Sequence, residues 1–129
     1  MSAHELTWKQ YEKHIELYRF YWEIVVKINT FHYAITGAIL SFYFSHTQPA
    51  EVKWSLLLPA FLSICWAVVF AYGAVANMIT RQDVFDLRDA MGLKVAPEFL
   101  VLTVVLGIFS LAHAITAVAL VYLICGGSA

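Results

Sequence analysis

Two long stretches without a charged side chain, residues 54–79 and 99–125, limit this chain to very few folds. A helix crosses a hydrocarbon core about 30 Å thick with roughly 20 residues, so each stretch can span a membrane with some tilt. The composition agrees, because 61% of the residues are hydrophobic and 13% are charged, against about 25% charged in soluble domains. The sequence therefore predicts an integral membrane protein.

A third, less obvious span is predicted over residues 28–46, which are mostly apolar but contain Asn29, Thr30 and His32. The preceding residues 5–27 contain no Gly or Pro, so we expect one helix from residue 3 to 46. The predicted fold is all-α, with three transmembrane helices, the first two extended into the cytoplasm. Its single domain, 1–129, divides into a cytoplasmic or interfacial helix (3–27), spans at 28–46, 54–80 and 97–125, and a cytoplasmic extension of the second helix (81–92).

Turn and cap residues mark the helix ends. The second helix is expected to begin near Glu51, after a turn at Gln48 and Pro49, and Gly92 is expected to cap its far end. The third helix is expected to begin at Pro97, with the following glutamate near its positive end. Val84, Leu87 and Met91 share one side of the extension, which is expected to pack on the N-terminal helix.

The distribution of Lys and Arg predicts the orientation. With three spans, seven of the eight Lys and Arg residues flank the same side, and only Lys53 lies on the other. Positive residues favour the cytoplasmic side, so we expect a cytoplasmic N-terminus and an external C-terminus in a bacterial inner membrane. The net charge of −1 and the lack of a basic patch argue against a nucleic-acid partner.

One arc of the first helix changes from charged to small residues. At 100° per residue, charged positions from Glu5 to Lys27 share this arc, and small residues continue it to Ser45. We take it as a subunit contact or the lining of a central pore, with four charged residues at the entrance and three small ones at the constriction. These are Glu16, Arg19, Glu23, Lys27, Thr30, Gly37 and Ser41. The alternative is a solvated face with ion pairs Glu16–Arg19, Arg19–Glu23 and Glu23–Lys27, and with Lys27 reaching to the interface.

Aromatic residues occupy roughly the opposite side of this helix, from Trp8 to Trp22. They suit the headgroup region or packing against another helix. Under an anchor hypothesis, Trp8 and Trp22 dock a cytoplasmic protein partner.

Three polar residues within the predicted spans, His32, Asn77 and His113, form a candidate intramembrane site. Ionisable groups in a membrane indicate function by default, either on a proton or ion path or as haem ligands. The structural alternative is a neutral imidazole hydrogen-bonded to a neighbouring helix, with Asn29 and Asn77 joining helices in the same way. Cytochrome b anchors also have three spans, but the expected Arg and His clusters are missing here. His32 is expected near the inner end of its span and His113 in the middle, so we expect no cofactor.

No motif predicts an enzyme. The sequence has no metal-ligand cluster, glycine-rich phosphate loop or nucleophile constellation, and Cys65 and Cys125 are expected at depths too different for a disulfide. We therefore expect a homo-oligomer in the lipid bilayer that forms a channel or pore-like assembly, including the class of membrane-permeabilising effectors. The alternative is a non-conducting anchor or scaffold that recruits a cytoplasmic partner. A third hypothesis is an electron-transfer subunit.

Overall fold

The computed structural model describes residues 3–45, 50–94 and 96–126, and it consists of three long helices. These are α1 (Ala3–Ser45), α2 (Leu57–Ala90) and α3 (Phe99–Gly126), with a short 3-10 helix, η1 (Ala50–Leu56), before α2. The described segments contain no strand. All three helices are long and apolar enough to cross a membrane, so the predicted all-α fold with three membrane-spanning helices is confirmed.

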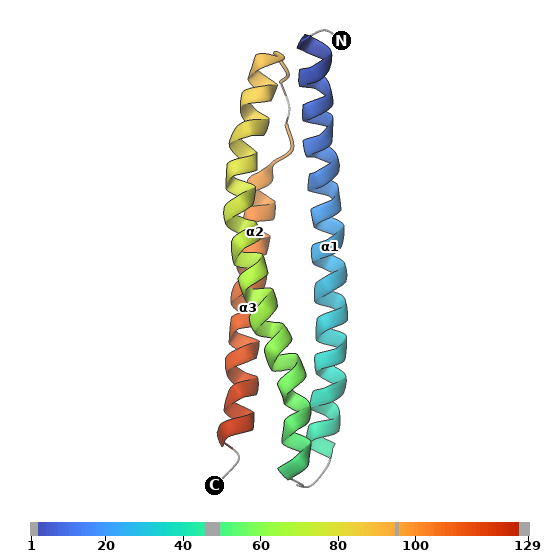
Figure 1. Cartoon of the computed structure of the whole chain (residues 1–129), viewed down its shortest axis with the longest axis vertical. Coiled ribbons are helices and arrows are strands. Elements are labelled where there is room, and N and C mark those ends of the chain that lie inside the picture. Colours follow the sequence, from blue (N-terminus) through green and yellow to red (C-terminus); the bar gives the residue numbers. More distant parts are fainter. Residues whose placement is uncertain (1–2, 46–49, 95, 127–129) are drawn as a thin grey trace.

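The helices lie side by side along one long axis (Figure 1). α1 and α3 run in the same direction and α2 runs in the other, so Ala3 and Gly126 lie at opposite ends of the bundle. This up-down-up order follows from the short connections between consecutive helices.

Three clusters of buried apolar residues follow one another along this axis. Near the N-terminal end, Tyr11 packs with Val84 and Phe99; in the middle, Val25 packs with Phe70, Leu102 and Leu106. At the far end the core consists of Leu56, Ala60 and Leu120, against which Ile39, Leu40 and Tyr43 of α1 pack. The expected packing of Val84, Leu87 and Met91 on the N-terminal part of α1 is confirmed.

Polar side chains join α2 and α3 within the apolar spans. The Asn77 amide donates hydrogen bonds to the Phe99 carbonyl and to the Thr103 hydroxyl, both at 2.8 Å. The Ser110 hydroxyl donates to the Ala67 carbonyl at 2.8 Å. The expected role of Asn77 in joining helices is therefore confirmed.

The far end of α2 is capped as expected. Gly92 has φ +67°, a left-handed conformation that glycine adopts without a steric cost. The Gly92 amide donates to the Asp89 carbonyl at 3.1 Å and the Leu93 amide donates to the Arg88 carbonyl at 3.0 Å. These two bonds form a Schellman motif, which satisfies carbonyls at the helix end.

Two helix starts differ from the predictions. The chain forms η1 at Ala50–Leu56 before the α-helix begins at Leu57, so Pro59 falls in the first turn of α2, where its missing N–H costs nothing. α3 begins at Phe99 rather than at Pro97. Glu98 caps it instead, because its carboxylate accepts a hydrogen bond from the Leu100 amide at 3.0 Å. The predicted turn at residues 48–49 lies outside the described residues.

The Asn77–Thr103 bond predicts a measurable coupling between α2 and α3. In a double-mutant cycle of Asn77→Leu and Thr103→Val, we expect a coupling free energy of about 0.6 to 1.7 kcal/mol, as for interhelical hydrogen bonds in other membrane proteins. Unfolding by steric trapping in bicelles measures it. Thr80→Val is the control, since the Thr80 hydroxyl bonds only within its own helix, to the Ala76 carbonyl. A coupling of zero would show that the bond contributes nothing to the α2–α3 contact.

Candidate functional site

Five buried polar side chains meet near the middle of the bundle, and we call them the polar cluster. Each is at most 5% exposed. The members are Asn29, His32 and Thr36 of α1, Ser63 of α2 and His113 of α3.

Two hydrogen bonds of this cluster tie α1 to the other two helices. His113 Nε2 lies 3.0 Å from Asn29 Oδ1, and His32 Nε2 lies 3.0 Å from Ser63 Oγ. The Thr36 hydroxyl is 3.4 Å from the same His32 nitrogen. Because residues 29, 32 and 36 lie three and four apart, they share the face of α1 that points into the bundle.

The hydrogen bonds of Asn29 define the tautomer of His113. The Asn29 amide nitrogen donates to the Val25 carbonyl at 2.7 Å, so its oxygen is the atom that faces His113. An amide oxygen only accepts hydrogen bonds, so His113 Nε2 carries the proton and donates. His113 Nδ1 is then a lone pair, and it is buried without a hydrogen-bond partner in the structure.

Aromatic rings surround His113. The Tyr33 ring is stacked on it with a centroid distance of 5.2 Å, and the Phe70 ring with 5.5 Å. The His32 ring meets it edge-on at 4.7 Å. The two imidazoles are therefore level with each other, and the prediction that they lie at different depths is wrong, because α1 is displaced along the bundle relative to the predicted spans.

This geometry limits the chemistry of the cluster. The histidine rings touch, so no macrocycle fits between them as it would between two axial haem ligands. Within the described residues, no group of three or more His, Cys, Asp or Glu side chains could hold a metal ion. The free Nδ1 lone pair can accept a hydrogen bond from a small donor such as water.

Asn77 lies apart from the polar cluster, on the α2–α3 contact described above. Of the three residues predicted to form an intramembrane site, the structure therefore brings His32 and His113 together and leaves Asn77 elsewhere. Sequence reasoning did not include Thr36 in any site, and it placed Ser63 only on a small-residue packing face of the second helix. The spacing of Asn29, His32 and Thr36 on one face of α1 could have identified Thr36.

The predicted arc of α1 lies on the outside of the bundle. All seven candidate residues of this outer arc, Glu16, Arg19, Glu23, Lys27, Thr30, Gly37 and Ser41, are exposed. A Cβ added at Gly37 would meet no atom within 4 Å. The small residues of the arc are therefore not used to pack this chain's own helices.

The ion pairs on the outer arc are only partly those expected. Lys27 Nζ lies 3.2 Å from the Glu23 carboxylate, as predicted. Glu16 instead pairs with Lys13, at 2.6 Å, and this hydrogen bond and charge raise the pKa of Lys13. Arg19 pairs with neither glutamate in the structure, so two of the three predicted pairs are wrong.

The polar cluster sets the depth of the outer arc relative to α3. His113 is fourteen residues from Phe99 and thirteen from Gly126, so it marks the middle of α3. Its partner Asn29 is only two residues from Lys27, or about 3 Å along the helix axis. Glu23 is six residues from Asn29, or about 9 Å. Lys27 therefore lies level with the middle of α3, whereas the sequence predicted it at the edge of a span.

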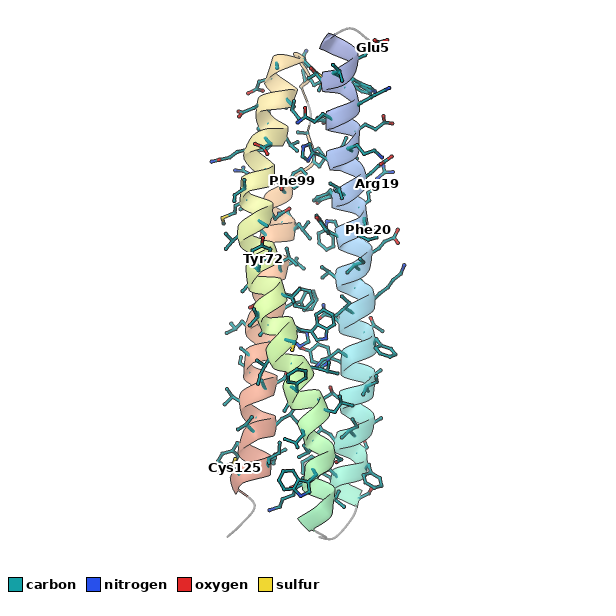
Figure 2. All side chains as sticks on the ribbon, viewed as in Figure 1. Glu5, Arg19, Phe20, Tyr72, Phe99 and Cys125 are labelled. Carbon is teal, nitrogen blue, oxygen red and sulfur yellow. The ribbon has the colours of Figure 1, made fainter. Side chains whose placement is uncertain are left out.

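Packing and the view in Figure 2 agree with this register. The rings of Tyr18 and Phe99 meet edge-on with centroids 4.8 Å apart, and Figure 2 shows Arg19 at the height of Phe99 and Phe20 slightly above Tyr72. The charged residues from Arg19 to Lys27 thus lie beside the first half of α3.

At this level the other side of the bundle is entirely apolar or aromatic. The exposed residues of α2 and α3 here include Tyr72, Val75, Val104 and Ile108, each more than half exposed. One layer of the molecule therefore presents charge on the outer arc of α1 and a lipid-compatible surface on α2 and α3.

The two tryptophans predicted to dock a partner have different surroundings. Trp22 is half-buried and packs against the Val25–Phe70 core, so it belongs to the bundle itself. Trp8 is 48% exposed and borders a hollow of about 320 Å³ on the surface of α1, beside Glu12 and Arg19. Only Trp8 is therefore placed to contact a partner.

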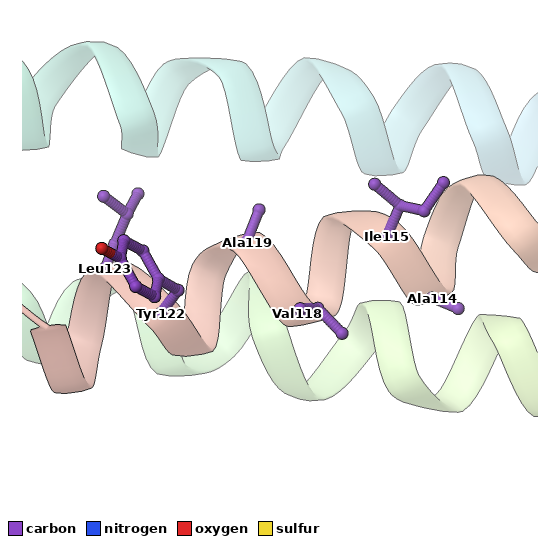
Figure 3. A pocket seen from close by; sticks show the side chains of 6 residues that line it. All are labelled: Ala114, Ile115, Val118, Ala119, Tyr122 and Leu123. Carbon is purple, nitrogen blue, oxygen red and sulfur yellow. The ribbon is translucent and has the colours of Figure 1, made fainter.

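A larger open hollow of about 630 Å³ lies along the last part of α3. Figure 3 shows Ile115, Ala119 and Leu123 pointing toward α1, while Val118 points away from it. Its other lining residues are Ala114 and Tyr122. Its lining is aliphatic apart from Tyr122.

Comparison of the chain with protein-family models, with curated proteins and with solved structures finds no match.

The tautomer of His113 is directly testable. In ¹⁵N solid-state NMR of the protein in lipid at neutral pH, we expect a protonated Nε2 and an unprotonated Nδ1 for His113. In Asn29→Leu the acceptor is lost, so the Nε2 proton loses its hydrogen bond and its resonance shifts. Asn77→Leu is the matched control and leaves the His113 resonances in place. A His113 that carries its proton on Nδ1 would contradict the hydrogen-bond assignment.

Proposed function

We propose that this chain is a small integral membrane protein that assembles into a homo-oligomeric channel or pore, with the outer arc of α1 facing the central opening. The observation that supports this is the depth of the charged residues. Lys27 lies level with the middle of α3, and the Glu23 carboxylate lies one turn away on the same exposed face.

A charged side chain facing hydrocarbon is unfavourable. Insertion scales place the cost at about 2.5 to 3.5 kcal/mol for Lys, Arg or Asp at the centre of a helix. The Glu23–Lys27 ion pair reduces this cost but leaves both side chains about two-thirds or more exposed. A monomer centred in the bilayer on α3 would turn this pair toward lipid. An assembly that turns it toward water removes the penalty.

Large apolar residues flank the outer arc on both sides. Phe20 and Phe31 lie along one edge and Val26 and Phe44 along the other, each more than half exposed. These side chains suit contacts with neighbouring copies, and the small residues at Gly37 and Ser41 allow helices to approach closely. A closed ring with cyclic symmetry is the simplest such arrangement.

In this assembly Glu16, Arg19, Glu23 and Lys27 set the charge of the entrance, and Thr30, Gly37 and Ser41 form the constriction. The positive-inside bias supports a cytoplasmic N-terminus in a bacterial inner membrane. Such a pore acts either as a regulated channel or as an effector that permeabilises the membrane.

The alternative proposal is a non-conducting anchor whose exposed Trp8 recruits a cytoplasmic protein. The hollow beside Trp8 favours it, because aromatic and charged side chains line the same exposed stretch of α1.

Replacing a small residue of the outer arc with a larger one tests the proposed assembly. Gly37→Leu is expected to disrupt the ring or abolish conductance, because the added side chain projects into the proposed constriction, where the helices approach one another. Gly107→Leu is the matched control on α3, where an added Cβ likewise meets nothing within 4 Å. Mass photometry in nanodiscs and planar-bilayer recording measure both effects. Equal behaviour of the two variants would remove α1 from the proposed interface.

Exchanging the charges of the central pair tests the lining. The double variant Glu23→Lys with Lys27→Glu retains an ion pair but reverses its direction along the pore. We expect a changed ion selectivity, measured as a shift in reversal potential under a salt gradient, with the subunit number unchanged. The same double exchange at Lys13 and Glu16, farther from the middle, is expected to have a smaller effect. An unchanged reversal potential and conductance would show that the pair does not line the path.

A further inference from the structure

A cleft between α1 and α2 opens on the side of the bundle away from the outer arc, and we call it the α1–α2 cleft. Its volume is about 310 Å³, at the lower end of the range for ligand sites. Ile24 and Ile28 of α1, Val69 and Ala76 of α2 and Leu106 of α3 line its body.

The cleft has the length of one leaflet. Val25 and Phe70, which both line it, belong to the middle core cluster, and Ile28 adjoins Asn29 of the polar cluster. One end therefore lies at the level of the middle of α3. The other end is Thr80, eleven residues from Val69 along α2, or about 16 Å. Half of a hydrocarbon core is about 15 Å.

The polarity of the lining changes along this length. The end near the middle is formed by aliphatic side chains, while Asn77, Thr80 and Tyr21 line the end toward the N-terminus of α1. The amide nitrogen of Asn77 is already used by α3. The Tyr21 side chain, 45% exposed, carries a hydroxyl that can donate to an ester carbonyl.

The mouth of the cleft is exposed and carries no charge, as a surface in contact with lipid would. Val69 and Tyr72 at its edge are 51% and 76% exposed, and no charged side chain lines it. An unfilled apolar cleft loses the dispersion contacts of its walls, and water inside it would lack polar partners along the aliphatic body. A flexible apolar chain that enters from the surrounding bilayer contacts the walls of the cleft along its whole length.

We propose that the α1–α2 cleft binds one acyl chain of a phospholipid from the leaflet on the N-terminal side, with its ester group beside Tyr21 and Thr80. The proposed lipid site does not rest on the proposed pore, because none of the residues that line the cleft belongs to the outer arc. The bound chain fills the space between α1 and α2 and so belongs to the native packing of the bundle.

The experiment counts the phospholipids that stay bound in native mass spectrometry after the membrane-extracted protein is washed extensively in mild detergent. We expect the wild-type chain to retain one phospholipid per subunit. Ala76→Phe fills the cleft and is expected to lose it, and Gly73→Leu, which fills the cleft from the next turn of α2, is expected to do the same. Ala71→Phe is the matched control, because Ala71 is exposed on α2 but does not line the cleft.

Thermal melting and oligomer mass accompany each count, so that a misfolded variant is recognised. Loss of the lipid from both filling variants, with retention by Ala71→Phe, supports the proposal. Absence of a retained lipid on the wild-type protein overturns it. Equal retention by Ala76→Phe and Ala71→Phe also overturns it. A changed subunit number in the filling variants without loss of lipid overturns it as well, because the cleft would then be a contact between copies.

Discussion

Hydrogen bonding in a medium without water is the constraint on which the rest of the structure depends. Polar groups in hydrocarbon must find partners within the protein, and the polar side chains on the inner face of α1 do so on two other helices. Asn29 pairs with His113 and His32 pairs with Ser63. A shift of α1 by one turn would separate both pairs, so these contacts determine how α1 is placed along α2 and α3.

That placement explains the two-sided character of the bundle. With α1 in this register, its charges from Arg19 to Lys27 lie beside the first half of α3 rather than beyond its end. The same register brings Ile28 and Val69 to the walls of one cleft between α1 and α2, and residues at the edge of this cleft are apolar and exposed. The outer arc and the cleft are thus consequences of one set of interior hydrogen bonds. We propose that they have opposite surroundings, with water or protein beside the arc and a lipid chain in the cleft.

Patterns within single segments predicted much of the fold. Uncharged runs identified the spans of α2 and α3, Gly92 marked the end of α2, and the shared face of Val84, Leu87 and Met91 indicated packing on α1. The depth of α1 was not predictable in this way. Charges up to Lys27 place the start of a span at residue 28 when a helix is considered alone. The actual depth depends on partners from other helices, and the pairing of Asn29 with His113 across 84 positions leaves no periodic signal. For the same reason Trp22, assigned a docking role under the anchor hypothesis, instead packs against the middle core cluster.

The central claim is that the outer arc lies at the depth of the lipid chains but contacts water. Spin labels in lipid, on a background with Cys65 and Cys125 replaced by alanine, test it most directly. Thr30 adjoins Asn29 and Leu111 is two residues from His113, so Thr30→Cys on the arc and Leu111→Cys on α3 lie at nearly one level. We predict that the label at residue 30 is relaxed mainly by a water-soluble nickel complex and the label at residue 111 mainly by oxygen. Equal, oxygen-dominated relaxation at both positions would show that the arc faces lipid and would contradict the account.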